Sequence, residues 1–137
     1  MIIEFDKKYL ENIYDLGTEL NEKYRNLYDV NSLNKDVNKT YILLENNYFV
    51  GFIHIQELVD EIDIIDIIID RNYRHNGYAT KLLDYIFDIN KDKKFILEVN
   101  VNNIPAINLY LKHGFIEIYR RKGYYNANDA IVMEKKW

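Results

Sequence analysis

A run of isoleucines, EIDIIDIIID at residues 61–70, limits the possible folds of this chain more than any other segment. β-Branched residues favour strands, and alternate residues of a strand point to the same face of a sheet. The isoleucines alternate as far as Ile64, and from Ile65 onward they alternate with the opposite parity. This change predicts a β-bulge, which bends the strand and re-aims its backbone groups.

The other strand-like segments predict a mixed sheet. They are residues 2–5, a hairpin over 40–59 around the turn ENN, residues 94–101, and a closing hairpin formed by EIYRRKGYY and DAIVMEKKW. The fourth and fifth strands flank a helix and should therefore be parallel, whereas the hairpins are antiparallel. We expect an α/β (α+β) fold, in which helices flank a mostly antiparallel sheet of about seven strands.

Helical spacing of apolar residues is present in three segments, and a short helix is expected within residues 28–39. The first helix would be capped by Asp6, with apolar positions Leu10, Ile13, Tyr14, Leu16 and Leu20. The second would bury Ala79, Leu82, Leu83, Ile86, Phe87 and either Ile89 or Asn90. The third, within residues 102–115, has Asn103 as N-cap, Pro105 in its first turn and Gly114 at its C-cap.

Length and composition exclude several classes of protein. With 137 residues and no repeat or linker, residues 1–137 are expected to form a single domain. The net charge of −4 argues against a nucleic-acid partner. The chain has no cysteine, no secretory h-region and no apolar stretch of roughly 20 residues, so we expect a cytoplasmic protein that does not span a membrane. His54, His75 and His113 lack metal-ligand spacing, so no metal site is expected.

The turn RNYRHNG after the isoleucine run has the chemistry of a phosphate-binding loop. The N-terminus of the following helix offers unpaired backbone N–H groups and roughly +0.5 charge, and a glycine lets a ligand approach the backbone closely. Gly77 is that glycine, and Arg74, with Arg71 and His75, would add positive charge. Taken alone, the same residues also fit a simple tight turn with solvated arginines. The Walker and dinucleotide-binding patterns are both absent.

The pattern Arg74-x-x-Gly77-x-Ala79 after a bulged strand resembles the acetyl-coenzyme A (acetyl-CoA) loop of the GNAT N-acetyltransferases. The predicted order of strands and helices resembles theirs over nearly the whole chain. The segments LEVNVNNIPAINLYLKHGF and RRKGYYNANDAIVME are similar to those of the RimI-type N-terminal alanine acetyltransferases of ribosomal proteins. The resemblance implies a GNAT fold and acetyl-CoA as the acetyl donor.

The resemblance also implies roles for particular residues. Glu98 would be the general base, acting through water, and burial in its apolar strand would raise the pKa of its carboxyl group. Tyr110 would be the general acid that protonates the departing thiolate. Without the family pattern, Glu98 could equally be an outward-facing glutamate of a half-exposed strand, and Tyr110 could be a tyrosine of the core. Contacts to the donor are expected from the backbone of Ile67, Ile68 and Ile69, from Arg74, His75, Asn76, Gly77, Tyr78, Ala79 and Thr80, and from Asn103.

The chain also departs from the RimI-type pattern where an acceptor would bind. Asn100 replaces a basic residue after LEV, and RNLYDVNSLNKD has no counterpart of the family's aromatic-rich segment. These departures bear on the identity of the acceptor. The resemblance implies transfer to a protein or peptide N-terminal α-amine, and the absence of cysteine favours direct attack within a ternary complex. A small-amine acetyltransferase acting on a polyamine, amino sugar or amino acid, and a non-catalytic acyl-CoA-binding module, are the alternatives.

Overall fold

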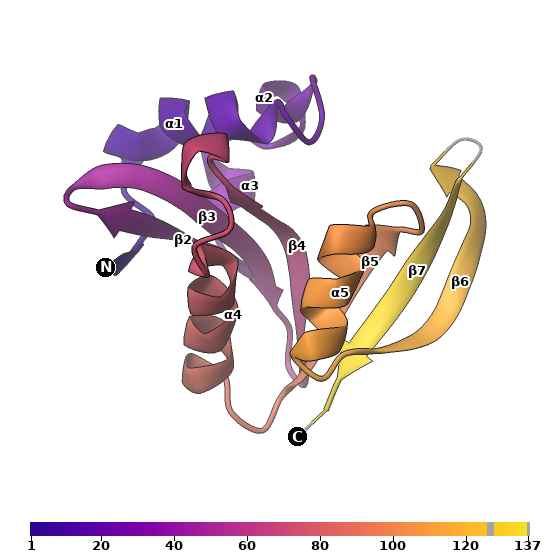
Figure 1. Cartoon of the computed structure of the whole chain (residues 1–137). Helices are drawn as coiled ribbons and strands as arrows, with labels where there is room; N and C mark the ends of the chain where they lie inside the picture. The colour runs from indigo at the N-terminus through magenta and orange to yellow at the C-terminus, as the bar shows by residue number, and fades with distance from the viewer. Residues whose placement is uncertain (126–127, 137) are drawn as a thin grey trace.

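The computed structural model describes residues 1–125 and 128–136. A seven-stranded sheet in the order β1-β2-β3-β4-β5-β7-β6 forms the centre of this part of the chain (Figure 1). The strands are β1 (Ile2–Glu4), β2 (Asn38–Glu45), β3 (Tyr48–Glu57), β4 (Glu61–Ile69), β5 (Lys94–Asn100), β6 (Ile116–Tyr125) and β7 (Asn128–Lys135). β4 and β5 are parallel and the other pairs are antiparallel, which confirms the predicted mixed, mostly antiparallel sheet.

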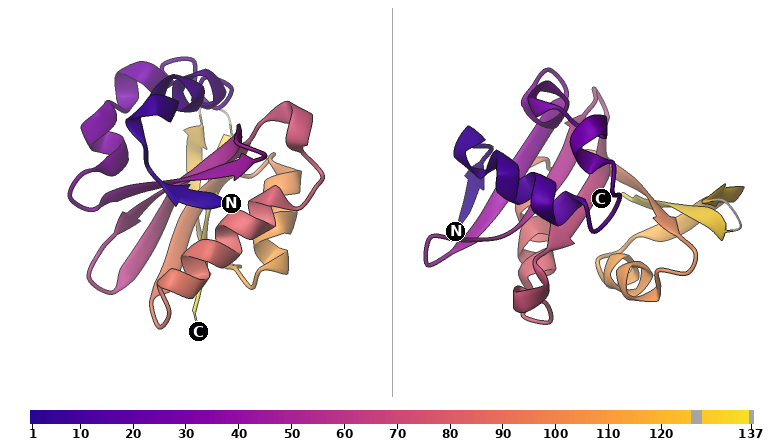
Figure 2. Two further views of the ribbon diagram at one scale, coloured as in Figure 1. Left: turned by 90° about the vertical axis from the view of Figure 1, so that its left-hand side faces the viewer. Right: turned by 90° about the horizontal axis from the view of Figure 1, so that it is seen from above.

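Helices cover both faces of the sheet (Figure 2, left). One face carries η1 (Lys7–Tyr9), α1 (Leu10–Gly17), α2 (Tyr24–Leu27) and α3 (Val30–Asn34), and the other carries α4 (Tyr78–Ile89) and α5 (Ile104–Lys112); the turn η2 (Arg71–Tyr73) joins β4 to α4. Each face buries its own apolar cluster. Leu82, Leu83 and Ile86 of α4 belong to one cluster, and Ile13 of α1 and Leu33 of α3 belong to the other.

The predicted β-bulge is confirmed in β4. Ile64 pairs with Ile55 of β3, whereas the next paired residue, Asp66, faces His54, so Ile65 is the extra residue. Since two residues of one strand then oppose one residue of the other, the side chains beyond the bulge change face. This is why Ile69, despite its opposite parity, joins Ile64 in the cluster under α4.

β4 and β5 pair over only part of their length. Their parallel ladder runs from Glu61 and Lys94 to Ile64 and Leu97, and ends where the bulge begins. Beyond that point β5 continues to pair with β7 on its other side, through Asn100. The bulge therefore coincides with a parting of the two central strands, and the sheet opens between them (Figure 1).

The N-terminal helices differ in part from their prediction. Asp6 caps the 3₁₀ turn η1 by accepting a hydrogen bond from Lys8 N. α1 ends at Gly17, so Leu20 lies beyond it and is exposed. A Cβ on Gly17 would lie 2.4 Å from the ring of Tyr24, so only glycine lets α2 pack this closely against α1. The short helix expected within residues 28–39 is α3, and α2 had not been predicted.

The C-terminal half follows its prediction closely. Asn103 caps α5 through a hydrogen bond from Ala106 N to its Oδ1, and Gly114 has a positive φ of 93° after the helix. At the end of α4, Ile89 is exposed and the C-cap residue Asn90 is buried, which settles the alternative left open there. Residues 126–127, which separate β6 from β7 in the sequence, and residue 137 lie outside the described part of the chain.

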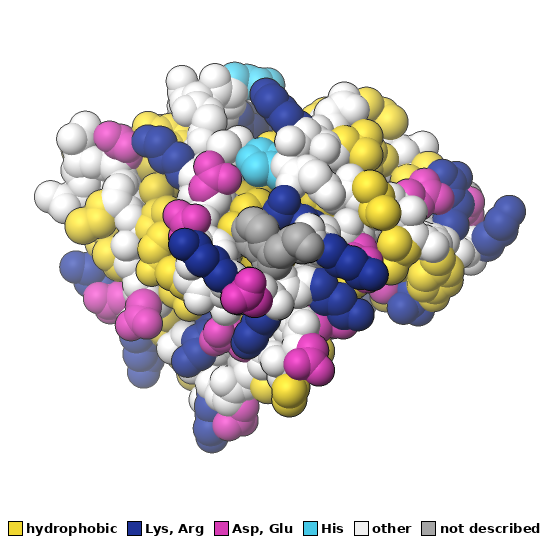
Figure 3. Space-filling model, turned by 90° about the horizontal axis from the view of Figure 1, so that it is seen from below, with side chains coloured by type: hydrophobic (Ala, Val, Ile, Leu, Met, Phe, Trp, Pro, Cys, Tyr) yellow, Lys and Arg dark blue, Asp and Glu magenta, His cyan; other side chains and the backbone are white. Residues whose placement is uncertain are grey.

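The surface shown in Figure 3 carries lysine and arginine side chains interspersed with aspartates and glutamates. No continuous basic face is visible from this side, in keeping with the chain's net charge of −4. Within the described residues, no helix has the length and apolar character needed to cross a membrane.

Candidate active site

Two adjoining cavities lie where β4 and β5 part. The loop cavity, of about 560 Å³, lies against the β4–α4 connection. The carboxylate cavity, of about 420 Å³, is lined by Asp66 of β4 and Glu98 of β5, beside α2. Five residues line both cavities: Leu20, Ile67, Asn103, Ala106 and Tyr110. A ligand that extends along the loop cavity therefore ends beside the carboxylates.

The loop cavity gathers nearly all of the residues predicted to contact the donor. They are Ile67, Ile68, Ile69, Arg74, His75, Gly77, Tyr78, Ala79, Thr80 and Asn103. Asn76 is the exception and does not line the cavity. Its side-chain Nδ2 donates to the carbonyl oxygens of Tyr73 and Arg74, at 3.0 and 3.1 Å, so Asn76 shapes the loop from within.

The start of α4 has the properties that a diphosphate needs. Gly77, the N-cap, has a φ of 78°, and a Cβ built on it would meet nothing within 4 Å. The space that a side chain at Gly77 would occupy is therefore free, and a ligand can fill it. Within the described residues no side chain caps α4, so the backbone N–H groups of its first turn face the loop cavity without an intrahelical acceptor. The loop thus fits the diphosphate of a coenzyme A thioester.

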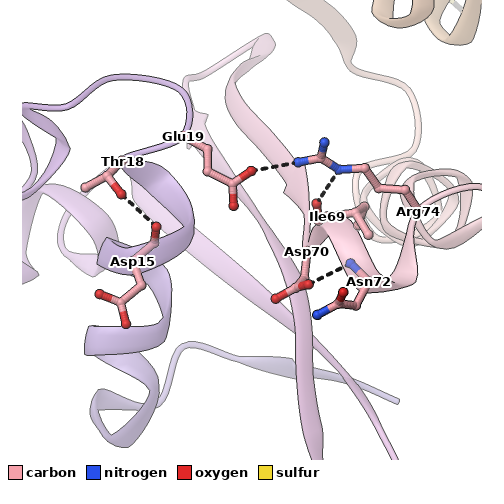
Figure 4. A network of polar contacts seen from close by, with 7 residues as sticks. All are labelled: Asp15, Thr18, Glu19, Ile69, Asp70, Asn72 and Arg74. Atoms are coloured by element: carbon pink, nitrogen blue, oxygen red, sulfur yellow. Dashed lines mark hydrogen bonds and ion pairs between the residues drawn. The ribbon is translucent and has the colours of Figure 1, made fainter.

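Arg74 is held between two acceptors at the mouth of the loop cavity (Figure 4). Its Nε donates to the carbonyl oxygen of Ile69 at 2.9 Å, and its Nη2 forms an ion pair with Glu19 Oε1 at 3.0 Å. Glu19 follows α1 in the chain, so this pair joins the loop after α1 to the β4–α4 loop. Arg74 supplies the predicted positive charge, but Glu19 balances it. Arg71, by contrast, does not line the cavity.

Glu98 points away from the core that its strand helps to build. Leu97, Glu98 and Val99 all line the carboxylate cavity, but only Leu97 and Val99 belong to the buried cluster under α4 and α5. The side chain is 29% exposed, and its Oε1 forms an ion pair with Nε of Arg121 at 2.9 Å. Glu98 is therefore a partly exposed carboxylate whose charge is balanced by Arg121, and not the deeply buried group that its apolar strand had indicated.

Tyr110 lies between the two cavities. It projects from α5, is only 7% exposed, and contacts the ring of Phe115 edge-on, with the centroids 5.7 Å apart. The ring thus packs in the core, as the alternative interpretation expected, and the residue also lines both cavities, while its role as general acid stays a prediction. Asn103 likewise combines a structural role, as cap of α5, with a place at both cavities.

Sequence reasoning missed Asp66, Tyr24 and Arg121. Asp66 lines the carboxylate cavity opposite Glu98, and burial raises the pKa of its carboxyl group to about 7, while the facing Tyr24 hydroxyl lowers it by less. Burial and the Asp66 carboxylate also raise the pKa of Tyr24 well above its ordinary value. The one feature of the sequence that could have indicated Asp66 is an acidic residue within the apolar run IIDIII. No such feature marks Arg121, because only the order of the strands in the folded sheet brings β6 close to Glu98.

Comparisons with known proteins agree with this arrangement. The sequence pattern that defines the acetyltransferase (GNAT) family matches residues 5–115. The [ribosomal protein bS18]-alanine N-acetyltransferase of Escherichia coli K12 is 32% identical over 99 residues, which are 66% of each chain. An N-alpha-acetyltransferase of Saccharolobus solfataricus is 36% identical over 93 residues, which are 62% of this chain and 56% of the relative. The match thus spans about two thirds or less of these relatives' length.

Solved structures show the same fold. The ribosomal-protein-S18-alanine N-acetyltransferase of Escherichia coli superimposes with a TM-score of 0.83 at 22% identity, over 99% of this chain and 92% of its own. Arabidopsis thaliana Naa50, in complex with the bisubstrate analogue CoA-Ac-MVNAL, superimposes with a TM-score of 0.85 at 22% identity, over 100% and 98% of the two chains. The bulged strand, the open glycine loop and the matched sequence pattern together show that this chain belongs to the acetyltransferase (GNAT) family.

Proposed function

We propose that residues 1–137 form one N-acetyltransferase domain that transfers an acetyl group from acetyl-CoA to the N-terminal α-amine of a protein or peptide. The observation that carries this proposal is the meeting of the two cavities at Ile67 and Tyr110. One cavity suits a diphosphate-bearing thioester, and the other presents carboxylates to an incoming amine. The relatives named for N-terminal acetylation support the choice of acceptor.

The donor would bind along the loop cavity. Backbone N–H groups of Tyr78, Ala79 and Thr80 would hold its diphosphate at the start of α4. Backbone groups of β4 beyond the bulge, at Ile67 and Ile68, would hold the thioester end and polarise its carbonyl group. Because β4 no longer pairs with β5 in this stretch, its edge is available to the donor.

The acceptor would bind in the carboxylate cavity. An N-terminal amine is mostly protonated near neutral pH and cannot attack a thioester in that form. Glu98 would accept the amine's proton through a water molecule, and Tyr110 would donate a proton to the departing thiolate. Since the described chain presents no cysteine for an acyl-enzyme, the acetyl group would move directly between the two substrates.

A small-amine acceptor is the second candidate, because one observation favours it. The residues of the carboxylate cavity include two carboxylates and three tyrosines, Tyr24, Tyr28 and Tyr110, but none of those described is a lysine or arginine. Such a lining suits a polycation. The spermidine N-acetyltransferase SpeG variant from Vibrio cholerae shares the fold, with a TM-score of 0.81 at 20% identity, over 99% of this chain and 94% of its own.

The test measures thiol release from acetyl-CoA with two sets of acceptors. One set contains peptides with free Ala or Ser N-termini, and the other contains spermidine, amino sugars and amino acids. We expect turnover with the peptides, and mass spectrometry should place the acetyl group on the α-amine. Turnover with spermidine but not with the peptides would indicate that the acceptor is a small amine and not a protein or peptide N-terminus. Binding of acetyl-CoA without turnover on any acceptor would indicate a binding module.

A further inference from the structure

Asp66 is a carboxyl group that forms no ion pair with any of the described residues. It lies on β4 directly after the bulge, and its Oδ2 is buried without a hydrogen-bond partner among the described residues. The facing hydroxyl of Tyr24 is likewise buried and lacks a hydrogen bond of ordinary geometry. Buried polar groups are rarely left in this state unless something else completes them. Asp66 also lines the carboxylate cavity, where a ligand can reach it.

The groups around Asp66 do not supply a positive charge. Tyr24 and Tyr28 lie on the side of α2, and Glu98 faces the same cavity from β5. His54 is the partner of Asp66 on β3, but burial lowers the pKa of its imidazole to about 4, so the ring is neutral at physiological pH. The nearby Arg121 is paired with Glu98. The cavity therefore contains one carboxylate balanced by arginine and a second one that is not.

The position of Asp66 suits a role in acceptor binding. The next residue, Ile67, lines both cavities and packs against the cluster under α4, whereas Asp66 faces Tyr24 on the opposite side of β4. Consecutive Cα atoms are about 3.8 Å apart, so Asp66 is within one residue of the predicted transfer point. A cation that enters beside α2 meets Asp66 as it reaches the donor.

We propose that Asp66 binds the ammonium group of the acceptor and thereby selects acceptors that arrive as cations. This inference rests on the proposed function and adds the group that recognises the acceptor. Asp66 holds the ammonium in the cavity, and Glu98 then takes its proton through water. Asp66 is thus a binding residue, and its loss should weaken acceptor binding more than it slows the transfer itself.

A binding measurement in the absence of turnover tests this role. An Ala-starting peptide is titrated calorimetrically into protein saturated with coenzyme A, which lacks the acetyl group. We expect Asp66→Asn to weaken the peptide Kd by about tenfold or more, because a charged hydrogen bond is lost. The N-acetylated form of the same peptide carries no ammonium, and it should bind weakly and equally to both proteins. Asp66→Ser provides a second variant if the first does not fold.

Asp63→Asn is the matched control. Asp63 lies on β4 and, like Asp66, is a carboxyl group whose pKa burial raises to about 7, but it does not line the cavity. Its substitution should leave the peptide Kd unchanged. The wild type should bind the peptide more tightly at pH 7.5 than at pH 6, since Asp66 becomes charged over that range, and Asp66→Asn should lose this dependence.

Three results would overturn the proposal. They are equal peptide Kd values for the wild type and Asp66→Asn, an equal loss in Asp63→Asn, and equal affinity of the wild type for the free and the N-acetylated peptide. In acetyl transfer, Asp66→Asn should raise KM for the peptide while kcat changes by only a few-fold. A wild type without turnover on any amine would refute the proposed function, whereas the binding comparison would still decide the role of Asp66.

Discussion

Arg121 of β6 forms an ion pair with Glu98 of β5, with 2.9 Å between its Nε and Oε1 of the carboxylate, although β7 lies between the two strands. The guanidinium also lies near the rings of Tyr119 and Tyr124, 5.5 and 5.6 Å from their centroids. Contacts on several sides limit the positions that the guanidinium can adopt. Arg121 does not line the cavity itself, so we expect it to act as a positioning residue that holds the carboxylate of the proposed base.

Arg121→Gln should lower kcat about tenfold and leave the Kd for coenzyme A unchanged, because Glu98 loses its fixed orientation. Steady-state kinetics and calorimetry measure the two quantities. Arg120→Gln is the matched control, since the neighbouring Arg120 pairs with Glu117 on its own strand. Arg121→Lys should restore part of the rate. A loss of equal size in Arg120→Gln would show that only the charge or the stability of β6 matters.

Glu98→Gln and Tyr110→Phe should each reduce kcat by roughly 10²-fold or more, the usual contribution of a general acid or base. Both substitutions preserve shape, and phenylalanine keeps the contact with Phe115. The Kd for coenzyme A should therefore stay at the wild-type value in both variants. Single-turnover transfer with a peptide acceptor measures the rate. Unchanged rates in both variants would refute the assignment of Glu98 as general base and Tyr110 as general acid.

Gly77→Val should weaken binding of coenzyme A, because a side chain is strained at a φ of 78° and would fill the space left for the ligand. Arg74→Glu should also weaken it, by about tenfold or more, since it replaces a cation with an anion beside the diphosphate and opposite Glu19. Arg71→Glu makes the same change of charge outside the loop cavity. Calorimetric Kd values equal to that of the wild type in the first two variants would contradict the loop assignment.

Asp66 should lower the stability of the protein as the pH rises. The pKa of its carboxyl group rises from an ordinary value of 3.8 to about 7 in the folded chain. Between these values the folded state binds more protons than the unfolded state, so this group's contribution to the free energy of unfolding falls as pH increases from about 4 to 7.

Asp66→Asn removes that dependence. The variant and the wild type should be equally stable near pH 4, and by pH 8 the variant should be more stable by up to about 4 kcal/mol. Urea unfolding at both pH values measures the difference, in which the contributions of all other titrating groups cancel. A variant that is less stable than the wild type at pH 8 would show that the carboxylate has a partner in the folded state.

Much of the fold could be predicted because its signals are local. The parity change at Ile65 predicted the bulge, and the sequence Asn46-Asn47 at the β2–β3 turn adopts positive φ values of 50° and 68°, as a tight hairpin requires. Leu20 was wrongly placed in the first helix, because its helical spacing is correct but the chain turns away after Gly17. The close contact of Gly17 with Tyr24 belongs to tertiary packing, which periodicity does not report.

The site could be predicted only where the family pattern marks it. Glu98, Tyr110 and the loop at Gly77 stand in recognisable motifs, and the structure brings them to adjoining cavities. The partners that tune the site come from distant segments: Glu19 reaches Arg74 from 55 residues away. In sequence, Asp66 resembles any polar residue of an alternating strand. Its burial becomes evident only once α2 covers that end of the sheet.

The parting of β4 and β5 has a consequence for the way in which substrates enter and products leave the protein. The glycine loop and the carboxylates line two different cavities, which share Ile67 and Tyr110 among their lining residues. Donor and acceptor would then enter by separate mouths and meet within the thickness of the sheet. Spent coenzyme could depart without displacing the acetylated product, so the order in which the two leave would be set by their own affinities and not by one blocking the other's exit.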